Sequence, residues 1–332
     1  MPRPLRVLLS LVLAGGLLTL VVLGSGLGLQ DLRSAFGALG WRMWMASLAV
    51  QGSLYVLRAL RLRALLGGGE GGARLGALIA VSATHTTLAY FLPARLGEAA
   101  LPLLLSRGAG ARASAGTAAL LLVRLLDLAC LALLMAAACL VLGAGSHAER
   151  LPWLTSAGWA LLVPAALFTG LLLCSGAAVR LGTGLLRLTG LGRTTPGARA
   201  LAFLPRVAAD ASAVGPGRLL HGALWSAPLW FGVFAFWGLV SVGTGLEGLS
   251  WAEATFGASL TVLSTLLPLN LFAGVGFQDA GFAFGFGLLG VSKEAAAASA
   301  LATHAIYAGN LALFGLIGQA WLARRRASGA AG

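Results

Sequence analysis

Two pairs of ionisable residues lie three positions apart in the first half of the chain. Arg95 and Glu98 interrupt one apolar segment, and Arg124 and Asp127 lie inside the next one. A spacing of three places two side chains on one face of a helix. Because a charge within an apolar helix is costly, we expect these four groups to pair with one another. Such pairs could simply hold two helices together, or an arginine fork could also bind a phosphate or carboxylate.

The second half of the chain carries a comparable set of polar residues. Gln278 and Asp279 interrupt an apolar segment, Asn270 lies just upstream, and His304 and Tyr307 are again three apart in the last apolar segment. His304 could carry protons, since its unperturbed pKa of ~6.5 is close to physiological pH. A buried, hydrogen-bonded histidine is the alternative reading.

The two interruptions, at 93–98 and 274–279, match each other. Each ends in a carboxylate that is followed by an ionisable residue in the next apolar segment. Glu98 precedes Arg124 by 26 positions (124 − 98). Asp279 precedes His304 by 25 positions (304 − 279). Paired, interrupted hydrophobic segments in two halves of a membrane protein indicate a transport site. The residues expected to break the helices are Pro93, Gly97, Gly274 and Gly276.

The amino-acid composition predicts that these residues lie in a membrane protein. The chain has 332 residues, of which 58% are hydrophobic and 10% charged, with a mean hydropathy of +0.90. Soluble domains average about 25% charged residues, so the chain is expected to be an integral membrane protein. The net charge of +13 is interpreted as the positive-inside bias of membrane proteins rather than as nucleic-acid binding. No catalytic, cofactor or metal-binding motif is found, so we expect no enzyme, although an intramembrane enzyme stays open.

We predict an all-α polytopic membrane protein with about six full spans. Two re-entrant broken-helix hairpins, within 76–106 and 255–290, would form an inverted-topology repeat of residues 41–142 and 219–322 in a single domain, 1–332. A run of apolar residues near the N-terminus is longer than the ~7–15 residues of a signal peptide, so it is interpreted as a retained span. The expected spans are 7–29, 41–57, 115–142, 153–176, 219–245 and 295–322.

The basic residues favour this topology. With a cytoplasmic N-terminus, 17 of them, including Arg58 and Arg61, would lie in cytoplasmic segments and 4 outside, as the positive-inside rule requires. Both termini would then be cytoplasmic. The basic connector, 177–218, would lie on the inner leaflet as amphipathic helix, with a solvated loop as the alternative. For His85, which precedes the first interruption, we prefer a packing role.

These motifs resemble the lysylphosphatidylglycerol synthase transmembrane-region, or flippase-like, family over roughly residues 5–325. Its members carry Pro-x-Arg-x-Gly-Glu, Arg-x-x-Asp and Gly-x-Gly-x-x-Glu elements, which correspond here to 93–98, 124–127 and 274–279. Asp279 stands where the family usually has glutamate, which shortens the reach of the acid. The full-length synthases continue into an aminoacyl-transfer domain, whereas this chain has only six residues after Arg326, so the resemblance does not imply that activity.

Stand-alone members look like lipid transporters, some of them associated with hopanoid or polyprenyl-lipid pathways. The resemblance therefore implies a flippase that moves an anionic or amphiphilic lipid across the bacterial inner membrane. The lipid could be an aminoacyl-phospholipid, a polyprenyl-phosphate-linked lipid or a hopanoid. A scaffold that presents a lipid to a separate lipid-modifying enzyme is the alternative, and a small-solute carrier is not separated from either by sequence. The residues expected to bind substrate are Arg95, Glu98, Arg124, Asp127, Asn270, Gln278, Asp279, His304 and Tyr307.

Overall fold

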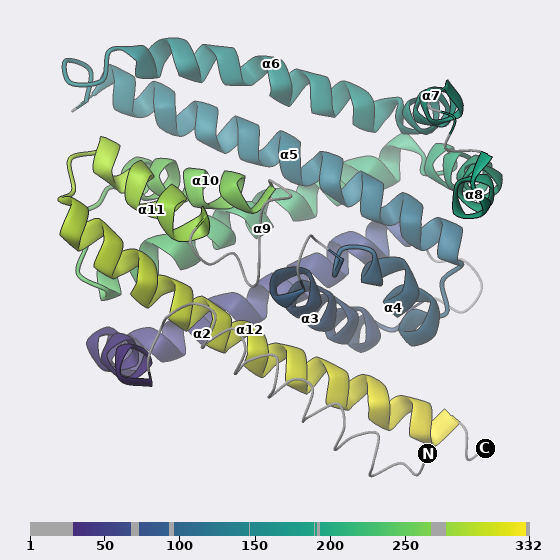
Figure 1. The fold of residues 1–332 in the computed structure, drawn as a ribbon, viewed down its shortest axis with the longest axis horizontal. Helices are drawn as coiled ribbons and strands as arrows, with labels where there is room; N and C mark the ends of the chain where they lie inside the picture. Colours follow the sequence, from purple (N-terminus) through teal and green to yellow (C-terminus); the bar gives the residue numbers. More distant parts are fainter. Residues whose placement is uncertain are drawn as a thin grey trace.

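The computed structural model describes residues 29–67, 73–92, 96–145, 147–188, 190, 193–266 and 277–329, and no strand occurs in these ranges. The predicted all-α class is therefore confirmed for the described chain (Figure 1). The helices are α2 (Leu29–Leu66), α3 (Leu75–Phe91), α4 (Ala100–Ala109), α5 (Ala113–Ala144), α6 (Trp153–Leu173), α7 (Ser175–Leu188), α8 (Thr195–Ser212), α9 (Pro216–Gly243), α10 (Trp251–Leu266), α11 (Phe277–Leu288) and α12 (Lys293–Gly329).

Local sequence signals fix several helix ends. Ser250 and Glu253 form a capping box at the start of α10: the Ser250 hydroxyl accepts from the Glu253 amide, and the Glu253 carboxylate accepts from the Ser250 amide. Gly110 ends α4 in the left-handed conformation, with φ of 71°. Gly40, with φ of 67°, kinks α2, and the predicted span 41–57 begins directly after this kink.

Four of the described helices, α5, α6, α9 and α12, are long and apolar enough to cross a membrane. They correspond to four of the six predicted spans, and they support the prediction of an integral membrane protein. The predicted span 41–57 lies within α2, whereas 7–29 lies outside the described residues. Apolar side chains such as Trp159 and Val163 on α6 are 62% and 70% exposed, as expected for a surface that faces lipid.

Each predicted broken segment consists of two helices that pack against each other. α3 contacts α4 on either side of the first break, and α10 contacts α11 on either side of the second. Glycine permits both approaches: a Cβ on Gly97 would lie 2.0 Å from the Leu88 carbonyl oxygen, and one on Gly285 would lie 2.5 Å from that of Gly257. Five predicted residues lie outside the described chain: Pro93, Arg95, Asn270, Gly274 and Gly276.

The helices α2–α5 and α9–α12 repeat one pattern of contacts. Exchanging α2 with α9, α3 with α10, α4 with α11 and α5 with α12 leaves the set of packed pairs unchanged. For example, α3 packs against α12 as α10 packs against α5, and α2 and α9 pack against each other. The two groups of four helices, called the first and second halves below, therefore share one arrangement of packed helices.

The predicted connector, 177–218, contains two helices, α7 and α8, rather than a loop. Figure 1 shows them side by side at one end of the α5–α6 pair, and α8 packs against α5. Leu181, Leu185 and Leu188 on α7 are 57% to 83% exposed. The prediction that α7 and α8 lie on the inner leaflet is not tested by these contacts.

Candidate functional site

A cavity of about 470 Å³ lies between the two halves. Every helix of both halves contributes to its lining, so the cavity exists only because the halves pack together. Its wall combines apolar side chains with charged ones, which is the usual composition of a ligand site. One lining residue from each of the eight helices in chain order is Arg58, Tyr90, Leu101, Leu128, Trp237, Val262, Gln278 and Tyr307.

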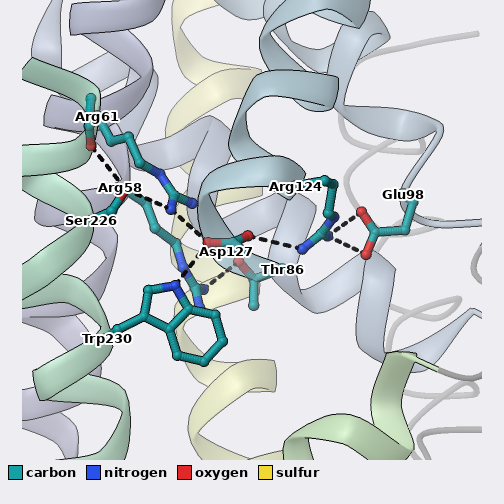
Figure 2. Close-up of polar contacts among 9 residues, drawn as sticks. Arg58, Arg61, Thr86, Glu98, Arg124, Asp127, Ser226 and Trp230 are labelled. Atoms are coloured by element: carbon teal, nitrogen blue, oxygen red, sulfur yellow. Dashed lines mark hydrogen bonds and ion pairs between the residues drawn. The ribbon is translucent and has the colours of Figure 1, made fainter. Parts of the chain in front are cut away.

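Asp127 is the centre of the charged network on one wall of the cavity. Its Oδ1 accepts from Arg61 Nη1 at 2.6 Å and from Trp230 Nε1 at 3.0 Å, and its Oδ2 accepts from Arg124 Nη1 at 3.2 Å. Arg61 also donates to the Ser226 hydroxyl at 3.3 Å. Figure 2 shows these partners converging on the carboxylate from α2, α5 and α9. A carboxylate with this many charged donors is held in one orientation.

Glu98 extends the network into the first break. Both of its carboxylate oxygens accept hydrogen bonds from Arg124 Nη2, so Arg124 bridges Glu98 and Asp127 (Figure 2). His85 Nε2 lies 3.6 Å from Glu98 Oε2, and the imidazole lines the same cavity. The interpretation of His85 as a packing residue therefore missed its place beside the charged network.

Arg58 differs from the other two arginines in the cavity wall. Its Nη1 donates to the Thr86 hydroxyl at 2.8 Å, and its guanidinium lies 5.9 Å from the centre of the Tyr55 ring. It forms no ion pair with any carboxylate in the described part of the chain. The lining thus holds three arginines and two carboxylates, Glu98 and Asp127, which leaves one positive charge unbalanced.

The helix that contains the predicted span 41–57 also contains Arg58 and Arg61, which were expected to lie beside the span. α2 continues to Leu66 instead of ending near position 57, and Arg61 is only 3% exposed. Its burial is possible because Asp127 neutralises it. The signal was present in the sequence: Arg58 and Arg61 are three apart, like Arg124 and Asp127, and so share a helix face.

The second half contributes a separate chain of hydrogen bonds. Asp279 Oδ1 lies 3.0 Å from His304 Nδ1, and His304 Nε2 lies 3.0 Å from the Tyr90 hydroxyl. Tyr90 comes from α3 and lines the main cavity. Asp279 and His304 line an adjoining cavity of about 10 Å³ together with Gln278, which also lines the main cavity.

The structure thus gathers the described candidates into two adjoining places. Glu98, Arg124, Asp127, Gln278 and Tyr307 line the main cavity, and Gln278, Asp279 and His304 line the small one. Their roles in binding a substrate remain predictions. In the part of the chain that the structure describes, no three histidine, cysteine, aspartate or glutamate side chains lie close enough together to hold a metal ion.

The fold and the cavity define a helical membrane protein with a charged site between two similar halves. The comparison with family models identifies it further: the model of the lysylphosphatidylglycerol synthase TM region matches residues 7–315. The chain belongs to this family, and the resemblance inferred from its motifs is confirmed. No curated protein and no solved structure matches the chain.

Proposed function

We propose that the protein is a lipid transporter whose cavity binds the headgroup of an anionic lipid. In this proposal it resides in the bacterial inner membrane with both termini in the cytoplasm, acts on membrane lipids, and catalyses no reaction. Membership of a lipid-related membrane family supports this class of substrate. The structural argument depends on one residue, Arg58.

Arg58 is the observation that carries the proposal. An ionised group at the centre of a membrane helix costs ~2.5–3.5 kcal/mol on insertion scales, and charges at depth normally pair with an opposite charge. Arg61 and Arg124 form ion pairs with carboxylates, whereas Arg58 donates to Thr86, lies over the Tyr55 ring and is within electrostatic reach of Asp127 without forming an ion pair. An anionic ligand in the cavity would supply the missing negative charge. A guanidinium is well suited to this because its planar fork binds phosphate with two parallel hydrogen bonds.

The remaining lining suits the rest of a lipid. Leu128, Leu131 and Val233 line the cavity beside the charged groups, and such side chains favour acyl or prenyl chains over water. The volume of about 470 Å³ is within the ~300–1,000 Å³ of small-molecule sites. It fits a headgroup with the first part of its chains, so the lipid tails would remain in the bilayer.

The repeated contact pattern supports a transport mechanism. In our proposal the two halves form an inverted-topology repeat, and each broken segment is a re-entrant hairpin. Rocking of one half against the other would then expose the cavity alternately to the two leaflets. Because every helix of both halves lines the cavity, such a motion would change its access directly.

Translocation of fluorescent lipids in proteoliposomes tests the proposal. We expect wild type to move NBD-labelled phosphatidylglycerol faster than the zwitterionic NBD-phosphatidylcholine. Arg58→Gln should slow the anionic lipid about tenfold or more, because a charge-assisted hydrogen bond contributes ~1.5–3 kcal/mol. Arg63→Gln is the matched control: Arg63 lies on the same helix and is exposed, so the rate should not change.

Three outcomes would contradict parts of this account. Equal rates for both lipids would remove the argument for an anionic headgroup. An unchanged rate in folded Arg58→Gln would remove Arg58 from the site. Binding of phosphatidylglycerol without any translocation would favour the scaffold that presents a lipid to a separate enzyme.

A further inference from the structure

In each half of the protein, the acidic residue that ends the interrupted segment contacts a basic residue on the fourth helix of that half. In the first half Glu98 binds Arg124 of α5, and in the second Asp279 binds His304 of α12. These contacts occupy equivalent places, since α5 and α12 correspond in the contact pattern. The basic groups differ in one respect: an arginine stays charged at any physiological pH, whereas a histidine gains or loses its proton.

We propose that Asp279, His304 and Tyr90 form a proton relay that couples protonation of His304 to anion binding in the main cavity. The inference rests on the proposed function, because it assigns the cavity an anionic ligand. It adds a second binding partner, the proton, and a site for it. It also assigns a role to Tyr90, which links the second half to the cavity.

Hydrogen-bond chemistry defines the two states of the relay. An ionised Asp279 only accepts, so His304 Nδ1 carries a hydrogen and donates it. In neutral His304, Nε2 then accepts from the Tyr90 hydroxyl across 3.0 Å. One added proton on Nε2 makes this nitrogen a donor to the Tyr90 oxygen. The hydroxyl hydrogen of Tyr90 must therefore turn away from the imidazole, and no other bond is broken.

An anion in the main cavity can accept a hydrogen bond from the released Tyr90 hydroxyl, because Tyr90 lines this cavity. Protonation of His304 thus frees the Tyr90 hydroxyl to donate to the ligand. It also places a positive charge on the imidazole next to Tyr90. By linkage, a proton that favours anion binding is itself bound more tightly when the anion is present. Such coupling is what a transporter needs to use a proton gradient.

The described groups around His304 come from several helices. His304 is 4% exposed, and Asp279 comes from α11 and Tyr90 from α3. On α12 itself, Tyr307 follows one turn later and packs against Tyr90, with ring centroids 5.1 Å apart. α9 contributes the uncharged Trp237 to the small cavity, and α2 contributes the cation Arg58 to the main cavity that Tyr90 and Tyr307 share.

A second, small cavity borders the Asp279 end of the relay. The small cavity of about 10 Å³ borders both Asp279 and His304, and it is about the size that holds one water molecule. Gln278 and Trp237 border both cavities. The proton added to Nε2 comes from the main cavity: the Tyr90 hydroxyl passes its hydrogen to Nε2 and takes another from the cavity side.

Calorimetric titration of the purified full-length chain with short-chain phosphatidylglycerol tests the relay. The phosphodiester of this probe stays ionised between pH 5 and 8, so any pH dependence belongs to the protein. We expect the wild-type affinity to rise about fivefold or more from pH 8 to pH 5. Binding should also take up protons, measured from the heat in two buffers of different ionisation enthalpy.

Three variants identify the group responsible. His304→Gln and Tyr90→Phe should each flatten the pH dependence to less than about twofold. Tyr90→Phe keeps the ring that packs on Phe91 and Tyr307, so it serves as the test if His304→Gln does not fold. Tyr55→Phe, which removes a buried hydroxyl bonded to Gln51, is the matched control and should keep the wild-type pH dependence.

The outcomes separate the relay from the proposed function. Binding of phosphatidylglycerol with no proton uptake, or with an undiminished pH dependence in Tyr90→Phe, would overturn the relay and leave the anionic-lipid site standing. A pH dependence that disappears in His85→Gln but persists in His304→Gln would overturn the relay and assign the effect to His85, near Glu98. Failure of wild type to bind the probe at any pH would overturn both.

Discussion

Asp127→Asn is expected to destabilise the protein strongly, although the substitution barely changes the size of the side chain. The carboxylate neutralises Arg61, which is 3% exposed, and also accepts from Arg124 and Trp230. An asparagine carries no charge and would turn its own NH₂ toward one of these donors. Arg61 would then have no anionic partner and only neutral ones, such as the Ser226 hydroxyl.

The expected loss in the free energy of unfolding follows from these partners. Removing one member of a buried ion pair costs about 3–5 kcal/mol, since the other charge remains buried without compensation. Arg124 still has Glu98, so only Arg61 becomes unpaired, and we expect the low end, about 3 kcal/mol. Equilibrium unfolding in mixed micelles of dodecyl sulfate and dodecylmaltoside, followed by tryptophan fluorescence, measures this free energy.

Asp210→Asn is the matched control for this measurement. Asp210 pairs with Arg112 at 2.7 Å, but the Arg112 side chain is 79% exposed, so water replaces the lost partner. Surface pairs of this kind contribute about 0–1 kcal/mol. If Asp127→Asn lowers the free energy of unfolding no more than Asp210→Asn does, the idea of a buried, mutually neutralised network is refuted.

Two further substitutions test how the second broken segment is built. Gly285→Val should lower the thermal unfolding temperature clearly, because its Cβ would lie 2.5 Å from the Gly257 carbonyl oxygen, whereas Gly287→Val on the same helix meets nothing within 4 Å and should have little effect. Equal shifts would contradict close packing of α10 on α11. Ser250→Ala should cost about 1 kcal/mol in the free energy of unfolding through loss of the α10 cap, and an unchanged value would show that the capping box with Glu253 does not contribute.

The long apolar helices were predictable because their signal is local. Predicted spans 115–142 and 219–245 agree with α5 and α9 to within a few residues at each end. The interrupted segments were also visible, since polar residues and glycines in an apolar run oppose a continuous helix. The pairing of Arg124 with Glu98 and Asp127 was expected for the same reason: charges at membrane depth require partners.

The missed site residues depend on contacts between distant parts of the chain. Arg61 was placed beside a predicted span rather than within the helix, because Asp127, the partner that permits its burial, lies 66 positions away in the sequence. The contact between Tyr90 and His304 spans 214 positions. Such pairs are determined by the packing of the two halves, which the local sequence pattern does not specify.

Photo-crosslinking of a lipid tests most directly that the cavity is the lipid site. Phosphatidylglycerol with a diazirine next to its headgroup would be incorporated with the full-length protein in proteoliposomes, and labelled peptides would be identified by mass spectrometry. We predict labels on cavity residues such as Leu128 and Val233, which fall in Arg58→Gln. Labels confined to the outward face of α6, around Trp159 and Val163, and unchanged in Arg58→Gln, would contradict the account.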